Sequence, residues 1–285
     1  MTSTFLLEIG TEELPADFAR QALDQLQDRV GRDLRDSRLD HESVQVLGTP
    51  RRLVVRVHGL ADRQPDLEEH RKGPPVAQAF KDGVPGPAAI GFAKRCGVEP
   101  SQLEVRDTPK GECLFASVRT EGQNSVDLLQ ELIPAWINGL QGRRFMRWGT
   151  GSQRFSRPIR WLLALKGVDL IPVEIPGADP PVRSDRFSRG HRLHGDQPLP
   201  IDTAEAYDDT LAAAGVIVDR QQRAALIRSQ LDASADQLNG LPDCPESLFE
   251  ELVDLVESPR LLQGSIAERF LSLPPEVIIT VMQAH

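Results

Sequence analysis

The chain has 285 residues, with 33 basic and 42 acidic side chains and a formal net charge of −9. Hydrophobic residues make up 40% and charged residues 26% of it, which is typical of a folded globular protein and excludes wholesale disorder. Three widely spaced cysteines (Cys96, Cys113, Cys244) favour neither a disulfide framework nor a zinc knuckle. No apolar stretch approaches the roughly 20 residues of a membrane span, and no signal peptide is recognisable. We therefore expect a cytoplasmic protein with no membrane association.

The first sixty residues predict a strand, a helix and a hairpin. Phe5–Ile9 is a short apolar strand, and an amphipathic helix follows with Pro15 in its first turn and its end near Arg38. Val44–Leu47 and Leu53–Val57 are β-branched and apolar runs separated by a Gly-Thr-Pro turn. This order of elements indicates an α+β fold.

Residues 61–110 are rich in proline and glycine and predict an irregular insertion or mobile arm, in which Ala88–Arg95 is helical. Beyond it we expect a strand, a helix and two paired strands: Leu114–Val118, Val126–Leu140, Ile159–Leu165 and Val168–Ile175. The insertion would interrupt the α+β domain.

The last third changes to helical periodicity. Four helices are predicted, at residues 203–214 with Asp202 as the cap, 219–238, 245–256 and 274–285. The sequence therefore predicts an α+β domain over residues 1–195 and a mainly helical section over 196–285. The last predicted helix has no stop signal, so we expect this section to be truncated.

Basic residues gather in one segment of this acidic chain. Residues 143–192 hold eleven basic and four acidic side chains, whereas residues 193–285 hold five basic and sixteen acidic ones. Within the basic segment, residues 143–160 contain six arginines and no acid. Arginine forks suit bidentate contacts with phosphate. The alternative is that these arginines pair with carboxylates of the acidic third, such as Glu250, Glu251 and Asp254.

Arginines are interleaved with aromatic residues in two stretches, Arg143–Trp148 and Arg154–Trp161. This pattern suits contact with an RNA backbone and stacking on bases. The other interpretation, favoured for the aromatic residues, is that they belong to the core. A second arginine pair stands at the mouth of the predicted hairpin. The candidate RNA-binding residues are Arg51, Arg52, Arg143, Arg144, Arg147, Arg154, Arg157, Arg160, His191 and Arg192.

No catalytic or metal site is recognisable. Gly149–Ser152 could offer backbone N–H groups to an anion but lacks the Lys-Ser/Thr ending of a P-loop. Glu8, Glu12 and Glu13 could form an acid/base pair, but the solvated start of a helix explains them better. We therefore expect no catalytic residue, cofactor or metal ion in this chain.

Ten collinear stretches give the sequence a family resemblance. They are Leu6–Ala16, Gly48–Leu53, Arg71–Pro74, Gly91–Ala93, Met146–Gly149, Phe155–Trp161, Gly190–Arg192, Ala214–Asp219, Leu271–Glu276 and Met282–His285. Together they resemble the amino-terminal part of the β subunit of bacterial α2β2 glycyl-tRNA synthetase. One departure is Leu193, where the family more often has an aromatic residue.

The resemblance implies a division of labour. In that family the α subunit carries the class II catalytic site for glycine and uses ATP and Mg, so this chain would position tRNA(Gly) and support the α dimer. The resemblance also implies a fold similar to the B3/B4 domain of the phenylalanyl-tRNA synthetase β chain. Two alternatives remain open: a stand-alone RNA-binding or editing-like module on this fold, and a structural scaffold whose arginines pair internally.

Overall fold

The computed structural model describes residues 2–81, 83–109, 111–194 and 197–284. The chain divides into two compact units: the main unit, Met1–Asp62 with Val126–His285, and the inserted unit, Arg63–Ser125. The inserted unit overlaps the insertion predicted over residues 61–110 and extends past residue 110.

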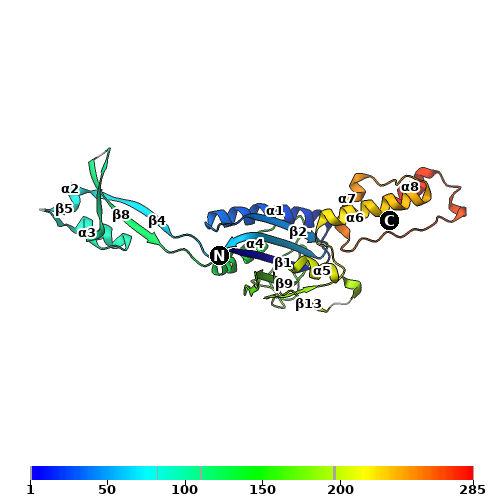
Figure 1. Cartoon of the computed structure of the whole chain (residues 1–285), viewed down its shortest axis with the longest axis horizontal. Coiled ribbons are helices and arrows are strands. Elements are labelled where there is room, and N and C mark those ends of the chain that lie inside the picture. Colours follow the sequence, from blue (N-terminus) through cyan, green and yellow to red (C-terminus); the bar gives the residue numbers. More distant parts are fainter. Residues whose placement is uncertain (1, 82, 110, 195–196, 285) are drawn as a thin grey trace. The chain divides into compact units, whose positions relative to one another are not determined.

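A six-stranded sheet organises the main unit (Figure 1). Its strand order is β10 (Asp169–Leu170), β9 (Ile159–Lys166), β1 (Thr2–Thr11), β3 (Arg52–Ala61) and β2 (Ser43–Thr49). These neighbours are antiparallel, and β11 (Ser184–Asp185) adds a parallel pairing to β9. The central strand β1 is almost entirely buried because strands and helices cover it on every side.

One face of this sheet carries the larger core. Side chains alternate along a strand, so Phe5, Leu7 and Ile9 point to the same face. Helices α1 (Ala16–Asp36) and α4 (Ser125–Asn138) bury their apolar sides against that face. Figure 1 shows α1 lying along the sheet. The four-residue spacing of apolar residues in both helices produces this packing.

The opposite face carries a smaller core and a polar cluster. Leu6, Val54 and Leu163 pack against Tyr207 and Leu211 of helix α5 (Tyr207–Ala213). Residues two positions away on the same strands share this face. They are Glu8 on β1, Arg52 on β3 and Trp161 on β9. Charged and apolar side chains are thus buried on one surface.

Helices dominate the rest of the main unit: α6 (Arg220–Leu238), α7 (Glu246–Leu255) and α8 (Pro275–Ala284). The Asp219 carboxylate caps α6 by accepting hydrogen bonds from the backbone N–H groups of Gln221 and Gln222. Helix α7 is fixed by Asp254, which pairs with Arg220 of α6 and with Arg20 of α1. Two short strands, β12 (Phe187–Arg189) and β13 (Pro198–Pro200), pair with each other, and β12 contacts β9.

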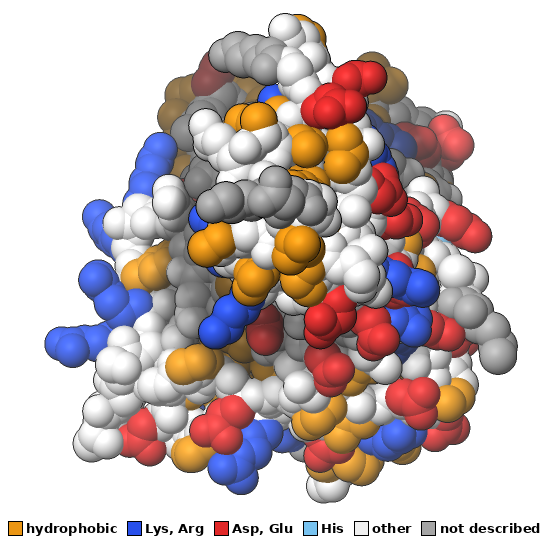
Figure 2. All heavy atoms as spheres, turned by 90° about the vertical axis from the view of Figure 1, so that its left-hand side faces the viewer, with side chains coloured by type: hydrophobic (Ala, Val, Ile, Leu, Met, Phe, Trp, Pro, Cys, Tyr) orange, Lys and Arg blue, Asp and Glu red, His pale blue; other side chains and the backbone are white. Residues whose placement is uncertain are grey.

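The inserted unit contains an antiparallel sheet in the order β4 (Leu67–Pro75), β8 (Gly111–Thr120), β7 (Glu104–Thr108). Helices α2 (Val76–Ala79) and α3 (Pro87–Cys96) and a small hairpin of β5 (Phe80–Lys81) and β6 (Val84–Pro85) complete it. Phe92, Leu114 and Ala116 form its core. In Figure 2, hydrophobic side chains are exposed between acidic and basic ones.

The prediction of an irregular segment over residues 61–110 was wrong for β4 and β7, because both are regular strands of this sheet.

The prediction of an α+β fold is confirmed at the level of mixed helices and antiparallel sheets. The boundary predicted at residues 195 and 196 lies outside the described residues. The helix predicted from residue 203 begins at Tyr207, because the Thr203 hydroxyl accepts the Ala206 N–H and holds a turn there. The strand predicted over residues 168–175 is limited to β10.

No helix within the described ranges is long and apolar enough to cross a membrane.

Replacing Asp254 by Asn should destabilise the docking of α7. Burial raises the pKa of the Asp254 carboxyl, but hydrogen bonds from Arg220 and Arg20 outweigh this and hold it below its ordinary value. The ionised carboxylate therefore stabilises the fold at neutral pH, and this contribution disappears as the pH falls below about 4. We expect Asp254→Asn to cost about 1–3 kcal/mol at pH 7. Thermal melting across pH should show the difference from wild type shrinking in acid.

The control is Asp243→Asn, at an exposed position. An equal loss of stability in both variants, or a difference that does not depend on pH, would contradict this account of Asp254.

Candidate nucleic-acid interface

Four segments of the main unit meet around Trp161. A cavity of 240 Å³, here called the Trp161 pocket, is lined by Glu12, Arg51, Arg160, Trp161, Arg189 and Arg192. Antiparallel pairing explains the meeting, since Gly10 near the end of β1 is opposite both Arg52 at the start of β3 and Trp161 near the start of β9. The segments involved lie within or next to four of the stretches that carry the family resemblance.

The Trp161 ring forms one wall of the pocket. Its Nε1–H donates a hydrogen bond to the buried carboxylate of Glu8. The guanidinium carbons of Arg51 and Arg52 lie 5.7 Å from the ring centroid, and that of Arg189 lies 5.9 Å from it. A Cβ atom on Gly10 would lie 1.8 Å from Cε2 of the ring. Gly10 therefore leaves the space that the indole occupies.

A buried ionic network lies beneath the pocket. The Arg52 side chain is fully buried, and its Nε and Nη2 donate to Oε1 of Glu257 at 3.2 and 3.0 Å. Its Nη1 lies 3.6 Å from Glu8 and donates to the Arg189 carbonyl at 2.9 Å. Burial lowers the pKa of the Arg52 guanidinium, but Glu8 and Glu257 outweigh burial and raise it. All partners of this charge are inside the protein.

The structure thus places two sequence candidates differently from expectation. Arg52 does not reach solvent, because its guanidinium is held by Glu8 and Glu257. Glu8 is fully buried in β1, so the interpretation of this residue as part of a solvated helix start was wrong. Its carboxylate also accepts a hydrogen bond from the Ser188 hydroxyl at 2.8 Å. Both residues position the pocket above them.

Arg51 and Arg192 line the same pocket in different ways. Arg51 is 9% exposed, and its Nε and Nη1 atoms are buried without a hydrogen-bond partner within the described part of the chain. Its Nη1 lies 3.9 Å from Oε2 of Glu257. Arg192 is exposed and pairs with Glu13 at 3.0 Å and Glu12 at 3.6 Å. The pocket therefore combines a buried cation with exposed ones.

Of two further candidates, Arg160 also lines the pocket and His191 lies beside Arg192 in the chain. Arg160 is exposed and its Nε lies 3.3 Å from Glu12. His191 is half-buried, and its Nδ1 lies 3.3 Å from the backbone N–H of Leu193. The backbone N–H of His191 donates a hydrogen bond to the Ala214 carbonyl at 3.0 Å. His191 thus helps to fix the loop that carries Arg189 and Arg192.

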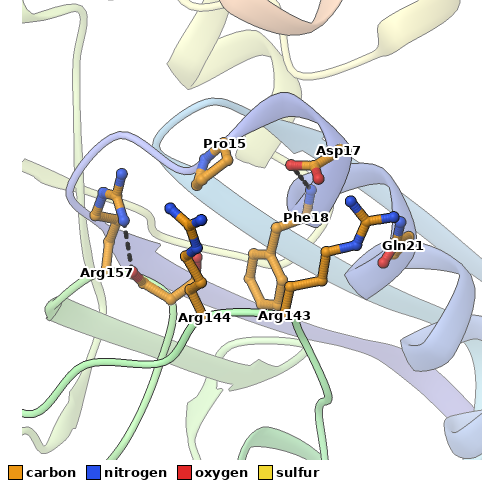
Figure 3. Close-up of a pocket in the computed structure, with 8 residues that line it drawn as sticks. Pro15, Asp17, Phe18, Gln21, Arg143, Arg144 and Arg157 are labelled. Carbon is orange, nitrogen blue, oxygen red and sulfur yellow. Dashed lines mark hydrogen bonds between the residues drawn. The ribbon is translucent and has the colours of Figure 1, made fainter.

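A second cavity, here called the arginine groove, holds three other candidates (Figure 3). It has a volume of 390 Å³ and is lined by Pro15, Asp17, Phe18, Gln21, Arg143, Arg144, Ser156 and Arg157. Figure 3 shows the side chains of Arg143, Arg144 and Arg157 extending beside Pro15 and the start of α1. Asp17 accepts the N–H of Phe18 at 2.8 Å, so its carboxylate is engaged at the helix start. The groove is cationic.

Arg147 and Arg154 line a further hollow of 480 Å³ with Phe145 and Ser152. Within the described ranges, Arg143, Arg144, Arg147, Arg154 and Arg157 form no ion pair with a carboxylate. The alternative partners Glu250 and Asp254 pair instead with Arg20 and Arg220. The internal pairing considered for the arginine segment is therefore not the arrangement found for these two acids.

The aromatic residues between these arginines belong to the core. Phe155 is fully buried, and its ring centroid lies 5.6 Å from that of Phe18 and 5.8 Å from that of Phe145. Phe145 and Trp148 are half-buried and pack against the same core. The core interpretation is thus confirmed for them, and they hold the arginine-bearing loops onto the sheet.

Sequence reasoning missed two contributors to this region. Arg189 directly precedes the Gly190–Arg192 stretch, and its alternation with Phe187 along β12 was a signal that could have found it. Glu257 follows helix α7 and lies 205 residues from its partner Arg52. No local pattern marks such a long-range pair.

Comparison with known proteins identifies the family. The sequence model described as Glycyl-tRNA synthetase beta subunit matches residues 5–285. The chain belongs to this family. Similar relatives are the glycine–tRNA ligase beta subunits of Synechocystis sp., at 47% identity over 282 residues, and of Shouchella clausii, at 41% identity over 286 residues. These alignments cover 99% and 100% of this chain but 39% and 40% of the relatives.

The chain therefore spans about two fifths of the length of these glycine–tRNA ligase beta subunits and matches their amino-terminal part. The resemblance drawn from the ten sequence stretches is confirmed at the level of the family. The family match covers both units of the structure, because the matched residues 5–285 include the inserted unit.

Replacing Arg52 by Lys should destabilise this member of the glycyl-tRNA synthetase beta subunit family. Lysine keeps the charge but cannot supply the planar fork that reaches Glu257 and the Arg189 carbonyl together. We expect a loss of about 1–3 kcal/mol in the free energy of unfolding, measured by denaturant titration. Arg160→Lys, at an exposed position, should change stability little. Equal stabilities of the two variants would contradict the buried network.

Replacing Gly10 by Ala should displace the Trp161 ring. The added methyl group has no space beside the indole, so we expect a loss of about 1–3 kcal/mol and altered tryptophan fluorescence. Gly91→Ala is the control, since a Cβ atom there meets nothing within 4 Å and lies in helix α3. That change should be neutral or stabilising by about 0.5–1 kcal/mol. Unchanged fluorescence in Gly10→Ala would show that the ring does not depend on this glycine.

Proposed function

We propose that this chain is a tRNA-binding and structural part of a glycine–tRNA ligase beta subunit. In this proposal it works with an α subunit, in an α2β2 tetramer in the cytoplasm, to attach glycine to tRNA(Gly). Catalysis, ATP and Mg belong to the α subunit, and the sheet of the main unit is a B3/B4-like domain. The names of the relatives support the ligase and its subunit.

The observation that carries tRNA binding is the arginine groove. Three of its arginines lack carboxylate partners within the described ranges, and their neighbours Arg147 and Arg154 also lack them. Unpaired guanidinium groups on a surface attract phosphate and form bidentate bonds to it. Because the aromatic side chains nearby are packed into the core, the groove would contact the RNA backbone rather than stack on bases. It would orient the tRNA without reading its sequence.

The test is a triple variant of the complete ligase, Arg143→Gln with Arg144→Gln and Arg157→Gln. We expect a higher KM for tRNA and unchanged glycine-dependent ATP–pyrophosphate exchange. The slope of log affinity against log salt should fall by roughly one unit or less for each lost phosphate contact.

The control has the same charge change at exposed arginines that already pair with carboxylates: Arg106→Gln, Arg183→Gln and Arg228→Gln. It should leave the KM for tRNA near the wild-type value. An unchanged KM together with a lower melting temperature in the groove variant would show that the groove is structural.

A further inference from the structure

We propose that the Trp161 pocket is a binding site for one phosphate group, supplied by a phosphate monoester or by free phosphate. This site is distinct from the arginine groove, with which it shares no lining residue. The inference does not depend on tRNA binding at the groove. It extends the proposed function only if the phosphate is that of an RNA end.

The charge of the pocket favours an anion. Four of its six lining residues are arginines, and Glu12 is the one carboxylate among them. Glu13 and Glu257 pair with arginines at its border. A group with two negative charges and several acceptor oxygens suits this excess of guanidinium donors better than a single carboxylate.

Arg51 provides the strongest observation. Its side chain is nine-tenths buried, yet its Nε and Nη1 atoms have no hydrogen-bond acceptor within the described part of the chain. Buried charged donors without an acceptor are costly and rare in folded proteins. Glu257 reaches this guanidinium only at 3.9 Å. Arg51 lines the pocket, so a phosphate bound there would place a negative charge beside this guanidinium.

Hydrogen bonds within the protein hold the Trp161 wall of the pocket and the Arg52 side chain beneath it in place. Glu8 fixes the Trp161 ring by a hydrogen bond, and Arg52 beneath it is held by Glu257 and by the carbonyl of Arg189. The same carbonyl contact restrains the backbone that presents the Arg189 side chain. Preorganised donors lose little freedom on binding, which increases affinity.

Glu12 is the competitor of the phosphate. Its two oxygens lie 3.3 Å from Nε of Arg160 and 3.6 Å from Nη2 of Arg192, so it bridges the two exposed arginines. A bound phosphate would take over these donors while Glu12 turns to solvent. Removing the charge of Glu12 should therefore strengthen binding, whereas removing an arginine should weaken it.

The experiment is calorimetric titration of the 285-residue chain with inorganic phosphate at neutral pH and constant ionic strength. We expect saturable binding that Arg160→Gln or Arg192→Gln weakens about tenfold, as for the loss of a hydrogen bond to a charged group. Glu12→Gln should strengthen it about two- to fivefold, as for the removal of an exposed competing ion pair. These exposed positions leave the buried network intact.

Two controls make the same charge changes in an exposed ion pair outside both cavities, Arg183→Gln and Glu174→Gln, and should leave phosphate affinity unchanged. The proposal is overturned if no saturable binding occurs, if the pocket variants and these controls behave alike, or if Glu12→Gln binds no more tightly than Glu174→Gln. The groove variants that test tRNA binding leave this pocket intact, so failure of either proposal is seen independently.

A second titration separates the two sources of phosphate. A short RNA duplex with a 5′-phosphate is compared with the same duplex carrying a 5′-hydroxyl. Tighter binding of the phosphorylated duplex, lost in Arg192→Gln, assigns the pocket to an RNA end. Equal binding of both duplexes, with inorganic phosphate still bound, assigns it to free phosphate.

Discussion

The buried guanidinium of Arg52 is the constraint on which the main unit depends. A charge removed from water requires partners of opposite charge and correct geometry, because an unpaired buried ion destabilises the fold strongly. Arg52 obtains them from Glu8 on the central strand and from Glu257 after helix α7. The pairing therefore connects the first strand of the chain with its helical last third. The Thr49 hydroxyl also donates to Glu257, at 2.6 Å, and adds the end of β2 to the same network.

The surface chemistry follows from this interior pairing. Since Glu8 is fixed by Arg52, it can hold the Trp161 indole, and the indole in turn forms the wall against which Arg51 and Arg189 lie. Burial raises the pKa of the Tyr207 hydroxyl well above its ordinary value, and the Glu8 charge adds to this effect. The tyrosine thus remains neutral beside the network. The hydrogen bonds that pair the buried charges thus also hold the Trp161 ring and the Arg189 backbone at the cationic pocket.

Local sequence patterns predicted most helices and strands but could not predict the buried ionic network around Arg52. The period of apolar residues predicted α1, α4 and α6, and the apolar run Phe5–Ile9 predicted the central strand. Arg51 and Arg52 look equivalent in sequence, but the pleat and the distant Glu257 bury Arg52 completely. Strand β4 was missed because most of its side chains are polar and exposed, so it shows no apolar alternation. Such strands are specified by their partners across the sheet rather than by their own residues.

The sequence showed that arginines gather in residues 143–160, but it could not show that they line three separate cavities. Arg143, Arg144 and Arg157 lie in the groove, Arg147 and Arg154 in a separate hollow, and Arg160 in the Trp161 pocket. The division arises because Phe145 and Phe155 anchor the two loops to the core, and β9 then carries Arg160 away along the sheet.

The net charge of −9 does not prevent these sites from attracting anions. Charges in solution are screened beyond about 8 Å at physiological ionic strength, so a phosphate close to a guanidinium responds mainly to its nearest neighbours. Glu250 and Asp254 are already neutralised by Arg20 and Arg220 on another part of the main unit. These two carboxylates thus pair with Arg20 and Arg220, and the guanidinium groups of the groove remain available for phosphate. In the proposed complex, acidic side chains elsewhere on the main unit would disfavour other orientations of a bound polyanion, and this repulsion would give the cationic sites directional selectivity.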